Sequence, residues 1–79
     1  MRVVSYEQRV ACMSAPGDED RQLRLAKAYV MRLRRRMRAT YSLDGKRELA
    51  DAIKEAESVL RRLRMNIFEL QDMLESRAG

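Results

Sequence analysis

Apolar residues recur along the second half of the chain at alternating steps of four and three residues. The members of this apolar seam are Leu49, Ile53, Ala56, Leu60, Leu63, Ile67, Leu70 and Leu74. A 4-3 repeat places all of its members on one face of an α-helix, as in a coiled coil. No proline or glycine interrupts the seam. The pattern therefore predicts one continuous helix over about residues 46–76.

A second apolar row of the same kind precedes the seam. Its members are Leu23, Ala26, Val30, Leu33 and Met37. Acidic residues 18–20 fall in the first turn of the implied helix and arginines in its last turns, as the helix dipole favours. We place this helix at about residues 18–39. The short connection that follows makes the two helices antiparallel neighbours, and Ser42 or Asp44 can cap the second one.

The N-terminal stretch carries a weaker helical signal. Ser5 and Gln8 have the spacing of a capping box. Apolar or aromatic side chains follow at helical steps, at Val3, Tyr6, Val10 and Met13. We predict a short helix over about residues 5–13, and a strand over residues 3–6 is the alternative. The expected fold is all-α: a single helical-hairpin domain spanning residues 1–79, with a short N-terminal helix.

Composition narrows the chemistry of the chain. Its 79 residues include no histidine and one cysteine, Cys12. These counts remove histidine-based triads, histidine metal sites and zinc clusters, and no glycine-rich phosphate loop is present. We expect no enzyme activity, no cofactor, no metal and no small-molecule substrate, with Cys12 a free thiol. No apolar run approaches the roughly 20 residues that span a bilayer, so we expect a cytoplasmic protein.

Positive charge gathers near the end of the first long helix. The chain has 17 basic and 12 acidic residues, a net charge of +5. The densest group consists of Arg32, Arg34, Arg35, Arg36 and Arg38. Such a run is a candidate nucleic-acid-binding surface. We favour the alternative of a solvated, partly neutralised helix face, because every arginine in the run falls outside the apolar row and together they wrap most of the way round the helix.

Several large apolar side chains lie off or beside the two rows. They are Leu25, Tyr29, Met31, Met65, Phe68 and Met73. A hairpin has one mutual interface, so such side chains stay in water unless something covers them. Covering one of them is worth about 1.5–3 kcal/mol. We interpret these residues as candidates for a partner-binding surface, although scattered apolar residues are common on protein surfaces.

Two segments are similar to a known family. Residues 51–60, with the sequence DAIKEAESVL, resemble the second-helix segment of the small co-chaperones of type III secretion needle subunits. Residues 6–10, YEQRV, resemble the N-terminal stretch of that family, and the loop falls at a similar distance from it. The resemblance implies a cytoplasmic, non-enzymatic protein that binds a helical-repeat chaperone and with it keeps the needle subunit from polymerising early.

Two functional hypotheses follow from the sequence. The first is an interaction protein, a small chaperone or adaptor subunit that completes its core against a helical partner, a helical-repeat protein or a second copy of itself. The second is a nucleic-acid-binding dimer, such as a small regulator or a phage-encoded factor, in which two hairpins form a four-helix bundle and align their arginine faces.

Overall fold

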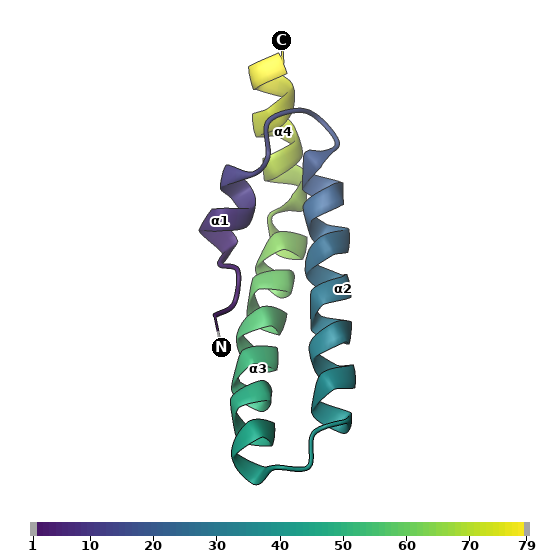
Figure 1. Ribbon diagram of the computed structural model, residues 1–79. Coiled ribbons are helices and arrows are strands. Elements are labelled where there is room, and N and C mark those ends of the chain that lie inside the picture. Colours follow the sequence, from purple (N-terminus) through teal and green to yellow (C-terminus); the bar gives the residue numbers. More distant parts are fainter. Residues whose placement is uncertain (1, 79) are drawn as a thin grey trace.

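The computed structural model describes residues 2–78, and within that range it contains helices and no strand. The helices are α1 (Tyr6–Ala11), α2 (Asp18–Arg38), α3 (Leu43–Met65) and α4 (Ile67–Ala78). Helices α2 and α3 form an antiparallel hairpin, and α4 continues beyond the end of α2 (Figure 1). The molecule is a rod of 51 × 17 × 16 Å. The predicted all-α hairpin with a short N-terminal helix is confirmed.

The interface between α2 and α3 buries both apolar rows. The buried members on α2 are Ala26, Val30 and Leu33, and those on α3 are Leu49, Ile53, Ala56, Leu60 and Leu63. Leu23 and Met37, at the two ends of the α2 row, are half-buried against the same core. Burying one large aliphatic side chain is worth about 1.5–3 kcal/mol, so this interface is the main source of stability.

The predicted seam helix differs from the structure at its start and near residue 66, and at both places a polar side chain bonds to the backbone. It begins at Leu43 rather than at residue 46, because the Ser42 hydroxyl accepts a hydrogen bond from the Gly45 amide at 3.3 Å. It is also not continuous to residue 76. Asn66 separates α3 from α4, with φ −105° and ψ 9°.

The break at Asn66 has a local cause in its side chain. The Asn66 amide nitrogen Nδ2 donates to the Arg62 carbonyl at 3.0 Å, and the backbone N–H of Asn66 donates to the same oxygen at 3.1 Å. Asparagine competes in this way for backbone groups that a helix interior uses. The seam nevertheless continues past the break, since Leu70 and Leu74 are buried and Ile67 is half-buried.

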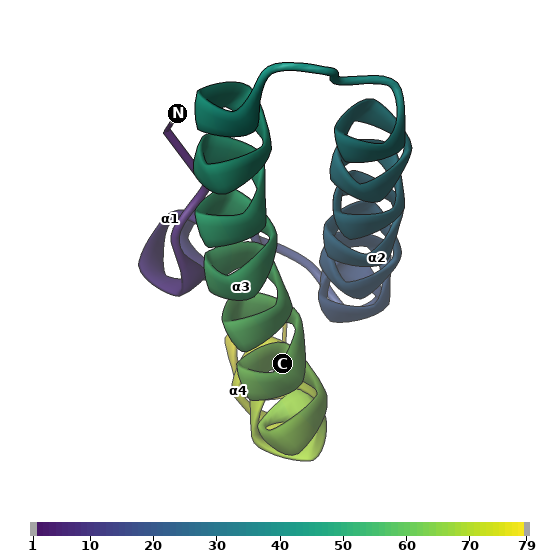
Figure 2. The same ribbon diagram turned by 90° about the horizontal axis from the view of Figure 1, so that it is seen from below.

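Helix α1 lies beside α3, on the other side of it from α2 as Figure 2 is viewed. The capping box forms as predicted. The backbone N–H of Gln8 donates to Ser5 Oγ at 3.1 Å, and the backbone N–H of Ser5 donates to the Gln8 side-chain oxygen Oε1 at 2.9 Å. The alternative of a strand at residues 3–6 is wrong, because α1 begins at Tyr6. Val3 and Met13, which flank α1, are buried in the common core.

The turn between α1 and α2 is held by carboxylates of the first turn of α2. Gly17 has a φ of 101°, a conformation that favours glycine. The Asp18 carboxylate accepts hydrogen bonds from the amides of Ser14 at 2.9 Å and Ala15 at 3.0 Å. The Glu19 carboxylate accepts one from the Gly17 amide at 2.8 Å. Hydrogen bonds from the Ser14 and Ala15 amides lower the pKa of Asp18.

Within residues 2–78, no helix combines the length and the apolar character that crossing a membrane requires.

Replacement of Leu63 by alanine tests the seam. Leu63 has 0% exposure, so we expect Leu63→Ala to lower the free energy of unfolding by about 2–5 kcal/mol, through lost transfer energy and a cavity. Urea denaturation followed by circular dichroism measures this. Met65→Ala is the matched control, because Met65 is 77% exposed on the same helix. Equal losses in the two variants would contradict the burial of the seam.

The pH dependence of stability tests the Asp18 turn. A carboxyl whose pKa is lower in the folded chain stabilises it above the unfolded pKa of about 3.9, and this contribution is lost as the pH falls through the folded pKa. We expect Asp18→Asn to reduce the drop in Tm between pH 6 and pH 3. Asp72→Asn on α4 is measured beside it as the control for the removal of one carboxylate. If Asp18→Asn leaves the drop in Tm unchanged, the Asp18 carboxylate does not stabilise the turn in the way we describe.

Candidate interaction surface

One side of the hairpin is closed by the N-terminal segment. The Arg9 side chain lies between α1 and α2, is 7% exposed, and donates from Nη1 to Gln22 Oε1 at 3.2 Å. Its Nε atom is buried and has no hydrogen-bond partner among the described residues. Burial lowers the pKa of the Arg9 guanidinium. Packing of α1 therefore carries a desolvation cost at Arg9.

A cation–π contact joins α1 to α3. The Arg62 guanidinium carbon lies 4.0 Å from the centre of the Tyr6 ring, and Arg62 Nη1 lies 3.2 Å from Glu7 Oε1. A backbone hydrogen bond lowers the pKa of Glu7, and the Arg62 charge acts in the same direction. Arg62 is thus engaged by α1.

The opposite side of the hairpin is open. A hollow of about 310 Å³ lies between α2 and α3, and an adjoining one of about 370 Å³ lies along α2 alone; the two share Met31 and Arg34. We call their combined lining the basic groove. It consists of Lys27, Val30, Met31, Arg34, Arg35 and Arg38 of α2 and Glu57, Leu60, Arg61 and Arg64 of α3. Val30 and Leu60 are 4% and 8% exposed. They belong to the core between the helices and form an apolar floor.

The basic groove holds an amount of charge equal to the net charge of the whole chain. Six of the 17 basic residues and one of the 12 acidic residues line it, which gives +5. The 11 basic and 11 acidic residues elsewhere cancel. The residues that line the basic groove therefore carry the positive excess of the chain.

One ion pair crosses the basic groove. Arg34 Nη2 lies 3.1 Å from Glu57 Oε2, and the two side chains are 53% and 38% exposed. An ion pair as exposed as this is worth about 0.2–1 kcal/mol, because water screens it.

The five arginines predicted as a nucleic-acid surface are all exposed, but they divide between faces of α2. Arg34, Arg35 and Arg38 line the basic groove, and Arg32 and Arg36 do not. Successive helix residues are about 100° apart, so neighbours in a run point in different directions. The run is therefore not one surface.

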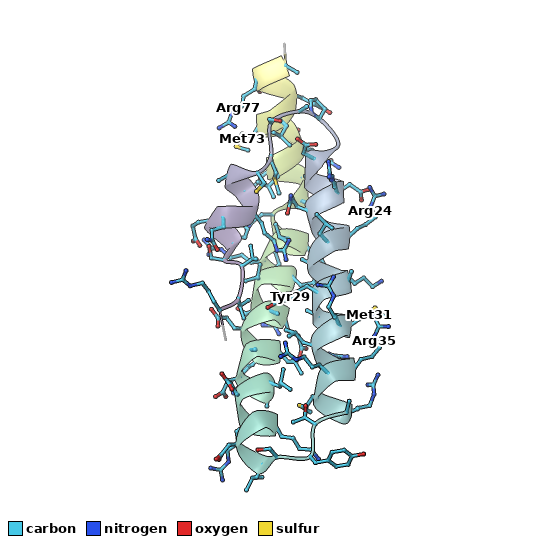
Figure 3. The ribbon with its side chains drawn as sticks, in the orientation of Figure 1. Arg24, Tyr29, Met31, Arg35, Met73 and Arg77 are labelled. Atoms are coloured by element: carbon cyan, nitrogen blue, oxygen red, sulfur yellow. The ribbon has the colours of Figure 1, made fainter. Side chains whose placement is uncertain are left out.

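The six predicted partner-binding residues also divide. Leu25, Met31, Met65 and Phe68 are 47–77% exposed. Tyr29 and Met73 are half-buried against the core, so they contribute first to the packing of this chain. Figure 3 shows Met31 and Arg35 projecting from α2 away from Tyr29. In the same view Met73 points from α4 towards the side on which α1 lies.

Sequence reasoning missed part of the basic groove, namely Lys27, Glu57, Arg61 and Arg64 as a set. The signal was present as a second helical row. Lys27, Met31, Arg34 and Arg38 follow steps of 4-3-4, and Glu57, Arg61 and Arg64 follow steps of 4-3. Each row lies on one face of its helix. The two rows meet because the hairpin is antiparallel.

The side chains of the basic groove are charged and apolar groups that can bind a ligand. Within residues 2–78, no cluster of three or more cysteine or carboxylate side chains is placed to hold a metal ion. Cys12 is an exposed free thiol. The basic groove combines cations with an apolar floor, a combination that suits an anionic ligand with an apolar face.

A double-mutant cycle on Arg34→Met and Glu57→Gln tests how open the basic groove is. We expect a coupling free energy below about 1 kcal/mol by urea denaturation, since both side chains are solvated. A coupling above about 2 kcal/mol would mean that the pair is a buried clasp that seals the groove.

No family model matches the chain. No curated protein and no solved structure matches it either.

Proposed function

We propose that this protein is a non-enzymatic interaction subunit of the cytoplasm, a small chaperone or adaptor that binds a helical segment of a partner protein. The observation that carries this proposal is the exposure of Met31, Met65 and Phe68, which are 55%, 77% and 75% exposed. The core of the chain is formed by other side chains, so these three remain exposed to water.

Exposed methionine and phenylalanine suit a binding surface on energetic grounds. Covering one such side chain is worth about 1.5–3 kcal/mol, and aromatic residues and methionine are enriched in the cores of protein interfaces. Methionine also adapts its shape to different partners. A surface with these side chains next to an open groove is well suited to take up a helix.

The family resemblance supports the same proposal. Residues 51–60 and 6–10 resemble segments of the co-chaperones of type III secretion needle subunits. On that basis the partner is a helical-repeat chaperone, and a second copy of this chain is the other partner we consider.

A nucleic-acid-binding function is the second candidate, and the basic groove favours it. Its six cations would attract a phosphate backbone. Two features weigh against it: no aromatic side chain lines the groove for base stacking, and Glu57 lies within it. We therefore rank protein binding first.

Site-specific photo-crosslinking in the native host distinguishes the two functions. A photoreactive phenylalanine analogue at position 68 should give a protein adduct of discrete mass, because Phe68 lies on the proposed surface. The matched control is the same analogue at position 41, since Tyr41 is 99% exposed at the hairpin loop. The adducts are resolved by gel electrophoresis and identified by mass spectrometry.

Each outcome of the crosslinking decides between the candidates. A protease-sensitive adduct at position 68 that is missing at position 41 supports the interaction subunit. Adducts that nuclease removes would favour nucleic-acid binding. Equal adducts at both positions, or none at position 68, would contradict the proposal.

A further inference from the structure

We propose that the basic groove binds an acidic amphipathic helix of the partner protein, which lies along the hairpin as a third helix. This inference rests on the proposed function, because it specifies the partner segment that the subunit recognises. The occupant carries an apolar stripe with acidic residues on both sides of it.

The apolar part of this inference comes from the floor of the basic groove. Val30 and Leu60 lie at the floor with Met31, 55% exposed, beside them. Two packed helices leave a furrow along each side of their contact, and a third helix can fill such a furrow at an interaxial distance of about 8–10 Å. On the other side of this hairpin the chain's own α1 and residues 3–13 provide a cover.

The acidic part comes from the two walls. Lys27 and Arg34 stand on the α2 wall and Arg61 and Arg64 on the α3 wall, and the second hollow extends the positive charge along α2 to Arg38. Residues 27–38 span roughly 17 Å at about 1.5 Å per residue, or about three turns of a bound helix. Acidic residues on both flanks of the apolar stripe would meet cations on either side, as the e and g positions of coiled coils do.

The same walls disfavour a second copy of this groove as the occupant. Pairing two basic grooves about a two-fold axis would bring six cations of each copy together. A phosphate backbone is also a poorer fit, because it offers no apolar face to Val30, Met31 and Leu60. Charge complementarity together with the floor therefore selects an acidic helix.

Fluorescence anisotropy with designed peptides tests this inference on the full chain. The probe is a labelled 21-residue peptide of three heptads, with leucine at positions a and d and glutamate at e and g, where the like charges also disfavour self-pairing. One control peptide has lysine at e and g, and a second has glutamine in place of leucine. A single-stranded oligonucleotide of 20 nucleotides is the fourth probe.

Charge reversal within the chain supplies the matched variants. Lys27→Glu with Arg38→Glu changes the basic groove, and Arg32→Glu with Arg36→Glu makes the same change on the same helix outside it. Since all four side chains are exposed, both variants should fold, as circular dichroism verifies. We expect the groove variant to weaken binding of the acidic peptide about 10-fold or more and the control variant about 2-fold or less.

The outcomes separate this inference from the proposed function. Preference for the acidic leucine peptide over both control peptides and the oligonucleotide, lost only in the groove variant, supports the inference. Equal binding of the lysine peptide, tighter binding of the oligonucleotide, or equal losses in both variants would overturn it. If the position-68 crosslink to a protein survives unchanged in the groove variant, the interaction function stands and the acidic-helix inference fails.

Discussion

A hairpin of two helices can enclose only the strip along which the helices touch, and this geometric limit governs the whole molecule. The strip here is the part of the seam from Leu49 to Leu63, and Leu63 is fully buried. A furrow remains on each side of it. The chain covers one furrow with α1 and its flanking residues Val3 and Met13, and leaves the other as the basic groove. The difference between the two sides of the rod follows from where the N-terminal segment packs.

The fold could be predicted from the sequence because its main determinant is periodic. The 4-3 seam, the matching row on α2 and the Ser5–Gln8 capping box are each visible as spacings, and each forms. The break at Asn66 could not be predicted from the seam, because the apolar spacing runs through it unchanged. It depends on a side-chain hydrogen bond to the Arg62 carbonyl. The early start at Leu43 likewise depends on the choice of Ser42 over Asp44 as the cap.

The candidate site was harder to predict, because it joins residues that are distant in sequence. The arginines of residues 32–38 attract attention as a run, yet the run distributes its charge around the helix. The basic groove instead combines Arg34, Arg35 and Arg38 of that run with Arg61 and Arg64 from the other helix. Helical phase within each element can be read from the spacing. The face of α2 that remains exposed depends on the side of the hairpin on which α1 packs. That packing is a tertiary contact, which the spacing within one helix does not show.

Arg9 has a consequence for how firmly α1 is held. Exposing an apolar side chain at this position to water would only cost free energy. The Arg9 guanidinium, in contrast, regains hydration at its unpartnered Nε when α1 detaches, which offsets part of the cost of opening. Opening of this short helix is therefore cheaper than its buried neighbours alone would make it, and the backbone amides of residues 6–11 should be the first helical ones to exchange with deuterium. We therefore expect α1 to detach from the rod before α2 and α3 separate from each other.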